Sequence, residues 1–207
     1  RGDRVATIAW NTPAGARVLD WYVGLAGEDG VYSHLLPEDV DAFRLGLAVM
    51  MEVPMVIVTV MRGGPSTGQP TNASQSDVYQ IRYASHGDYE LIVLSPGSVQ
   101  EMYELTIRAF NLSERYRTPV ILAADGVLGQ MMEPLFLNPK IEKVQRKLPR
   151  VGPQDYKPFQ VLDEDLVPDM AIAGTEYDFY ATGLTHDEMG NPRMDPESAE
   201  TLITRLC

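Results

Sequence analysis

An α/β fold with a mainly parallel sheet and helices on both faces is predicted by two kinds of segment that alternate along the middle of the chain. Short apolar runs rich in β-branched residues alternate with longer stretches whose apolar residues recur every three or four positions. The first kind suits strands buried on both faces, and the second suits amphipathic helices. Their order, strand–helix–strand–helix–strand, indicates a parallel sheet, because parallel neighbours need a crossover connection.

The N-terminal part gives weaker signals. Residues 5–21 mix small and apolar side chains, interrupted by proline and glycine, and we expect one or two broken helices there. The glycine-rich stretch 24–30 is expected to be a loop. Residues 40–50 place apolar side chains on one helical face, and Pro54 ends that helix.

The strands and helices of the central part follow in order. The run 55–61 predicts a strand that is closed by two glycines, and Ser76 with Asp77 opens a helix. A strand over 90–94 comes next, and Ser98 followed by Glu101 is a capping box that begins a helix over 99–116. The run 118–124 predicts the last strand, which ends at Asp125-Gly126.

A change of character near residue 134 predicts two regions. We expect residues 1–133 to form the α/β core and residues 134–207 to form an extended, irregular segment packed on that core. Within the second region, a turn is predicted at 186–192 and a helix over 196–206.

Composition excludes several classes of function. The net charge of −12, from 29 acidic and 17 basic residues, disfavours a nucleic-acid binder. Cys207 is the one cysteine among 207 residues, so this chain alone cannot form a disulfide, hold an iron–sulfur cluster or build a cysteine zinc site. We see no run of about 20 apolar residues and therefore expect no membrane span and a cytoplasmic protein.

The polar, glycine-rich loop from Arg62 to Thr71 is the candidate site. It follows a buried strand directly, and ligands of parallel sheets bind beyond the carboxyl ends of the strands. The Arg62 guanidinium suits a carboxylate, and the hydroxyls of Ser66, Thr67 and Thr71 can donate to a carboxylate or keto oxygen. The alternative is a surface turn whose arginine makes an ordinary ion pair. A phosphate-binding P-loop is excluded because no lysine follows Gly68.

This loop, RGGPSTGQPT, and the Gln75-Ser76-Asp77 that follows it resemble the signature of the alpha subunit of 2-oxoacid:ferredoxin oxidoreductases. The similarity covers roughly residues 45–195 and includes the segments 86–88, 91–96, 107–114, 117–122, 125–126, 147–150 and 182–188.

The resemblance implies a thiamine-diphosphate fold and an activity. The family decarboxylates a 2-oxoacid oxidatively to an acyl-CoA and reduces ferredoxin. Its alpha subunit holds the pyrimidine ring of thiamine diphosphate, and its beta subunit holds the diphosphate and magnesium. Iron–sulfur clusters would belong to partner subunits, among them gamma and delta subunits, and this chain alone would be inactive. 2-Oxoglutarate is the favoured substrate.

The resemblance also implies residue roles. Arg62 and Thr71 match the family residues that contact the carboxylate and keto group of the 2-oxoacid, and Ser66 and Thr67 would line the same pocket. The family's N-terminal Tyr-Pro-Ile-Thr-Pro-like segment is not found, and the N-terminal part is shorter than the family's. No catalytic glutamate is therefore assigned, and Glu38 is interpreted as the acid of a helix start. The alternatives are a pyruvate- or branched-chain-specific homologue and a non-catalytic scaffold of the same fold.

Overall fold

The computed structural model of the chain describes residues 7–9, 45–65 and 68–207. Its centre is a sheet of four strands in the order β1-β2-β4-β3, and every neighbouring pair is parallel. The parallel sheet predicted from the apolar runs is thereby confirmed. The strands are β1 (Thr7–Ala9), β2 (Met55–Met61), β3 (Ile92–Leu94) and β4 (Pro119–Asp125).

One expectation is wrong at β1. Broken helices were predicted within 5–21, but Thr7–Ala9 form a strand that pairs in parallel with the edge of β2, Thr7 opposite Ile57. Three residues cannot hold an extended conformation alone, so the ladder with β2 decides the outcome. The rest of that stretch, the glycine-rich loop at 24–30 and residues 40–44 lie outside the described residues, whereas residues 45–50 are helical.

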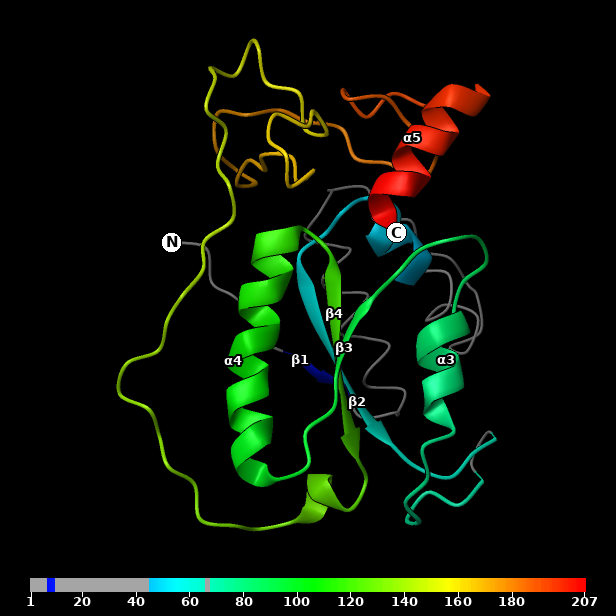
Figure 1. Cartoon of the computed structure of the whole chain (residues 1–207), viewed down its shortest axis with the longest axis vertical. Helices are drawn as coiled ribbons and strands as arrows, with labels where there is room; N and C mark the ends of the chain where they lie inside the picture. The colour runs from blue at the N-terminus through cyan, green and yellow to red at the C-terminus, as the bar shows by residue number, and fades with distance from the viewer. Residues whose placement is uncertain (1–6, 10–44, 66–67) are drawn as a thin grey trace.

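Helices lie on both faces of the sheet (Figure 1). The long helix α4 (Val99–Tyr116) packs against β4 and β2, and its Ala109 is completely buried. The short helix α3 (Asp77–Tyr83) lies on the other side, where its Ile81 joins Ile121 in the core. The strand β4 is buried along almost its whole length, which explains why its sequence is uniformly apolar.

Two helix starts follow directly from sequence. At α4, Ser98 Oγ accepts a hydrogen bond from the Glu101 N–H at 3.1 Å, while Glu101 Oε2 accepts from the Gly97 N–H at 2.7 Å. The predicted capping box is confirmed, with its return bond one residue earlier than in the usual pattern. The helix α5 spans Pro196–Leu206, as predicted, and Asp195 caps it.

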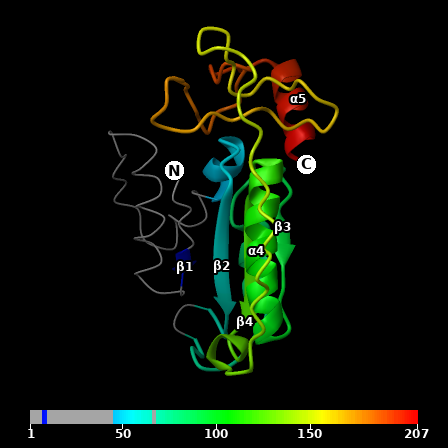
Figure 2. The same cartoon turned by 90° about the vertical axis from the view of Figure 1, so that its left-hand side faces the viewer.

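After β4 the chain makes the short 3₁₀ helix η1 (Leu128–Gln130) and then runs along the outside of α4 toward the opposite end of the sheet. Figures 1 and 2 both show this course. We call residues 131–146 the strap. It joins the carboxyl end of the sheet to an irregular region at the amino end, where α5 also lies. The predicted boundary between residues 133 and 134 stays a prediction.

Side-chain amides on α4 hold the strap by its backbone. Gln100 donates to the Phe136 carbonyl at 3.2 Å and accepts from the Phe136 N–H at 2.9 Å. Asn111 repeats the arrangement, donating to the Glu142 carbonyl at 2.9 Å and accepting from the Val144 N–H at 3.0 Å. Apolar side chains of the strap are left exposed, including Met132, Phe136 and Leu137.

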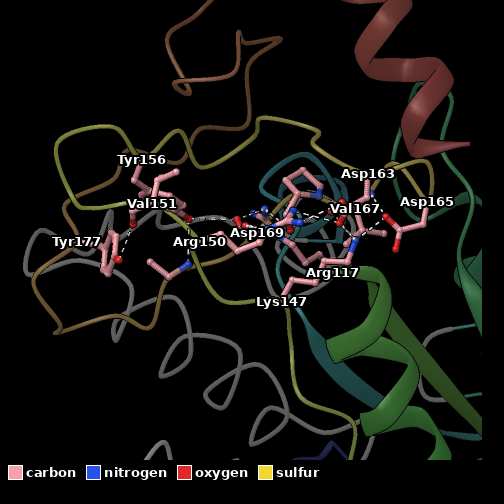
Figure 3. A network of polar contacts seen from close by, with 12 residues as sticks. Arg117, Lys147, Arg150, Val151, Tyr156, Asp163, Asp165, Val167, Asp169 and Tyr177 are labelled. Atoms are coloured by element: carbon pink, nitrogen blue, oxygen red, sulfur yellow. Dashed lines mark hydrogen bonds and ion pairs between the residues drawn. The ribbon is translucent and has the colours of Figure 1, made fainter.

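Arg117 joins the core to the irregular C-terminal region. It follows α4 with a left-handed backbone (φ 50°), and its side chain is buried. Its Nη1 donates to the Asp169 carbonyl at 3.2 Å (Figure 3). It also donates to the Pro158 carbonyl at 2.7 Å, and the guanidinium lies 5.4 Å from the centre of the Phe159 ring. Burial lowers the pKa of Arg117, and the nearby Glu52 carboxylate opposes that shift.

Charged pairs stabilise the same end of the molecule. Glu114 on α4 binds Arg146 at the end of the strap through two bonds of 2.7 and 2.8 Å. On the surface of the irregular region, hydrogen bonds from Arg150 and Lys147 lower the pKa of Asp163 to about 2 (Figure 3). The irregular region is therefore attached by specific polar contacts in place of regular secondary structure.

Candidate functional site

The candidate loop leaves the sheet beside the turn that follows β4. Met61 and Asp125, the last residues of β2 and β4, are partners in the parallel ladder, so both chains exit at the same edge. A Cβ atom on Gly126 would lie 2.9 Å from the Met61 carbonyl oxygen and 3.9 Å from the Arg62 Cβ. A glycine is needed at this position because the two chains approach so closely.

Backbone hydrogen bonds close the loop on itself. The Gly63 N–H donates to the Asn72 carbonyl at 2.9 Å, and the Gln69 N–H donates to the Gly63 carbonyl at 3.0 Å. Gly68 has a φ of +38°, and a Cβ there would lie 2.7 Å from the Gly63 carbonyl oxygen. The glycines of this loop thus serve tight closure as well as access to a ligand.

The four predicted site residues are only partly placed. Arg62 is half-buried at the base of the loop, and its Nη1 donates to the Gly63 carbonyl at 2.6 Å. Thr71 is exposed and directly precedes Asn72, which closes the loop opposite Gly63. The hydrogen bond between Gly63 and Asn72 therefore brings Arg62 and Thr71 together where the loop begins and ends. Ser66 and Thr67 lie outside the described residues.

Asp77 also belongs to this site, although its sequence context predicts no role beyond a helix start and a place in the family signature. Its Oδ2 accepts a hydrogen bond from the Arg62 N–H at 2.9 Å, across fifteen residues of chain. The preceding Ser76 makes no side-chain cap. The sequence shows an acid at a helix start close to a polar loop. It does not show that this acid binds the Arg62 N–H, because the fold brings the two residues together.

Two other polar residues have structural roles. Asp125 accepts from the Val127 N–H at 2.8 Å and so stabilises the turn after β4. His186 is buried against Phe159, with ring nitrogens 2.9 and 3.2 Å from the carbonyls of Asp187 and Met50. The turn predicted at 186–192 is seen, with a bridge between His186 and Pro192. His86 is exposed after α3.

The buried glutamates of the described residues are both paired with arginine. Glu52 binds Arg205 through bonds of 2.6 and 2.5 Å, and Glu114 binds Arg146. Glu52 precedes β2 and Glu114 lies just before β4, so both sit at the amino end of the sheet, away from the loop. No group of three or more metal-ligating side chains occurs in the part of the chain that the structure describes.

Gly68→Ala is expected to displace the loop. The new Cβ would collide with the Gly63 carbonyl, and alanine tolerates a positive φ poorly, so we expect a loss of about 1–3 kcal/mol in local stability. Hydrogen exchange of the backbone amides of residues 62–72 should become faster. Gly152→Ala is the control, because nothing lies within 4 Å of its added Cβ. Equal exchange in both variants would contradict the close packing at Gly68.

A family model of known proteins matches this sequence over residues 43–205, and it describes the thiamine-diphosphate-binding part of pyruvate flavodoxin/ferredoxin oxidoreductases. The chain belongs to this family. The match includes the loop, α3, α4 and β4, so the resemblance noted in the sequence is confirmed.

Named relatives of the family are similar over most of the chain. The 2-oxoglutarate synthase subunit KorA of Methanocaldococcus jannaschii is 49% identical over 163 residues, which are 79% of this chain and 44% of the relative. Its counterpart in Archaeoglobus fulgidus is 40% identical over 78% of this chain and 41% of the relative. A ketoisovalerate oxidoreductase subunit VorB of Methanothermobacter marburgensis is 54% identical over 85 residues, 41% of this chain and 24% of the relative. The chain therefore spans less than half the length of the curated relatives it matches.

A solved structure agrees with the fold. The 2-oxoglutarate:ferredoxin oxidoreductase from Magnetococcus marinus, with 2-oxoglutarate, coenzyme A and succinyl-CoA bound, superposes with a TM-score of 0.75 at 29% identity. The similarity covers 93% of this chain and 34% of that one. The parallel α/β architecture is thus that of the family. Within the described residues, no helix has the length and apolar content to cross a membrane.

Proposed function

We propose that this chain is the pyrimidine-side domain of an alpha subunit in a 2-oxoacid:ferredoxin oxidoreductase. The enzyme would convert a 2-oxoacid and coenzyme A to an acyl-CoA and carbon dioxide, with reduction of ferredoxin. The observation that carries the proposal is Arg62, held at the carboxyl edge of a parallel sheet in a glycine-rich loop of this family. In a protein of net charge −12, an anionic substrate needs such a local cation.

Each residue of the loop has a proposed role. Arg62 binds the substrate carboxylate through charge-assisted hydrogen bonds, and Thr71 donates to the keto oxygen. Ser66 and Thr67 line the same pocket. Thiamine diphosphate supplies the carbanion-stabilising chemistry when bound. No described residue is assigned to its pyrimidine ring, and the catalytic glutamate stays unassigned.

The proposal includes partner subunits. The relatives are named as subunits, and their names support an assembly of several chains. A beta subunit would supply the diphosphate and magnesium site, and partner chains, among them gamma and delta subunits, would carry the iron–sulfur clusters. Ferredoxin would be the electron acceptor, and the enzyme would work in the cytoplasm. The isolated chain would then be inactive.

2-Oxoglutarate is the favoured substrate, because several relatives are named 2-oxoglutarate synthase subunits and the solved neighbour binds 2-oxoglutarate. A branched-chain 2-oxoacid is the second candidate, supported by the 54% identity to a ketoisovalerate oxidoreductase subunit over 85 residues. The two candidate enzymes would differ in the shape of the substrate pocket.

Arg62→Ala tests the proposal. The full-length subunit is co-expressed with its partners, and coenzyme A-dependent reduction of a viologen dye is measured with 2-oxoglutarate, pyruvate and ketoisovalerate. We expect kcat/KM to fall at least about 100-fold, because the substrate carboxylate loses its charged partner. Arg62→Lys should recover only part of the loss, since lysine lacks the paired donors of the guanidinium.

The outcomes separate the candidates. Activity with ketoisovalerate but not 2-oxoglutarate would move the substrate assignment to the branched-chain class. A stable complex that reduces no dye with any of the three acids, despite added thiamine diphosphate, would support the non-catalytic scaffold instead.

A further inference from the structure

Among the described residues, the carboxylate of Asp77 ties the loop that carries Arg62 to a neighbouring element. Its Oδ2 accepts the Arg62 N–H at 2.9 Å, and both residues are half-buried. We propose that Asp77 is a positioning residue for the substrate loop, which it holds through the backbone of Arg62. This inference rests on the proposed function, because it assigns Asp77 to the same 2-oxoacid site.

The contact joins the end of β2, the loop that follows it and the start of α3. Arg62 is the first residue after β2, and Asp77 is the first residue of α3, which packs on the sheet through Ile81. Because α3 is held in place by this packing, the hydrogen bond from the Arg62 N–H to Asp77 also fixes the base of the loop. Acids at helix starts are common because they complement the helix dipole. Here the carboxylate is directed to a residue fifteen positions away.

The loop's own hydrogen bonds cannot supply this constraint. The bonds among Gly63, Gln69 and Asn72 close the loop internally, so they move with it as a unit. The Asp77 bond is a contact between that unit and the rest of the fold. Its loss would let the Arg62 backbone reorient, and the guanidinium at the end of a long side chain would move with it. A shift of the order of 1 Å at a positioning residue is costly for binding.

An acidic side chain near an anion site needs a reason, because its charge repels the substrate. Asp77 is needed for its acceptor oxygen at this position, and its charge is not needed. Three substitutions separate these properties. Asp77→Ala removes the acceptor, Asp77→Glu keeps the charge but displaces the acceptor by a methylene group, and Asp77→Asn keeps the acceptor in place without the charge.

The experiment uses the full-length subunit with its partners and has two readouts. Hydrogen exchange of residues 62–72 reports the loop directly, and KM and kcat for the 2-oxoacid report the site. Asp77→Ala and Asp77→Glu should speed exchange of the loop and raise KM at least about tenfold, with a smaller change in kcat. Asp77→Asn should stay within about threefold of wild type in KM. The thermal midpoint of each variant checks that the fold is retained.

Unchanged loop exchange in Asp77→Ala would overturn the inference. So would a normal Asp77→Glu beside an impaired Asp77→Asn, because charge and not position would then matter. Failure of the proposed function has a different signature, in which Arg62→Ala leaves KM unchanged. In that case the role of Asp77 toward the 2-oxoacid is refuted as well, whatever the exchange of the loop shows.

Discussion

Arg205→Ala is expected to lower the free energy of unfolding by about 3–5 kcal/mol. Arg205, in the last turn of α5, binds both oxygens of Glu52 at 2.6 and 2.5 Å. The Glu52 side chain is 4% exposed, so the variant would leave a buried carboxylate without its cation. Urea denaturation of the purified chain, followed by circular dichroism, measures the effect.

Two controls define what the pair contributes. Arg82→Ala removes a surface pair with Glu90 whose side chains are 49% and 57% exposed, and it should cost no more than about 1 kcal/mol. The double variant Glu52→Met with Arg205→Met should recover much of the stability, because no charge is then left buried. If Arg205→Ala costs no more than Arg82→Ala, the pair does not attach α5 to the core.

Arg117→Leu is expected to have a comparable effect, about 3 kcal/mol or more. Its guanidinium satisfies the carbonyls of Pro158 and Asp169 in a buried site, and leucine would leave both without that donor. Urea denaturation again measures the change, and hydrogen exchange should show that residues 147–195 open first.

Arg115→Leu is the matched control, because Arg115 lies two residues earlier in the last turn of α4 and is exposed. It should change the free energy of unfolding by less than about 0.5 kcal/mol. If Arg115→Leu and Arg117→Leu lower the free energy of unfolding equally, positive charge at the end of α4 stabilises the fold, and the buried contact of Arg117 with the carbonyls does not.

Much of the core could be predicted because its sequence obeys local rules. The strand β2 matches the predicted run 55–61, and α4 and α5 match their predicted ranges, since capping residues and uniform apolar runs mark them. The strand β3 is shorter than the predicted 90–94. The strand β1 was missed because its three residues have no periodicity to detect, and their pairing with β2 arises only in the fold.

The candidate site was predictable in part for the same reason. The position of Arg62 at the end of a buried strand follows from sequence order, and the ladder between β2 and β4 places it at the expected edge. Long-range contacts have no local signal. No pattern in the sequence around Asp77 indicates that Arg62 is its hydrogen-bond partner. The ion pair between Glu52 and Arg205 likewise joins residues 153 positions apart. The roles of Ser66, Thr67 and Thr71 stay predictions.

The middle of the strap is attached to α4 through its main chain, while its side chains there stay exposed. Gln100 and Asn111 bind main-chain atoms of residues 136, 142 and 144, so the attachment at these points does not depend on which side chains the strap carries there, proline excepted. Substitutions of the exposed Phe136 and Glu142 should therefore change the stability of the fold little, whereas Glu133, which accepts from the Val99 N–H at 3.0 Å, and Arg146 contribute through their side chains. The sequence of the strap between these two side chains can therefore vary while the architecture beneath it stays constant.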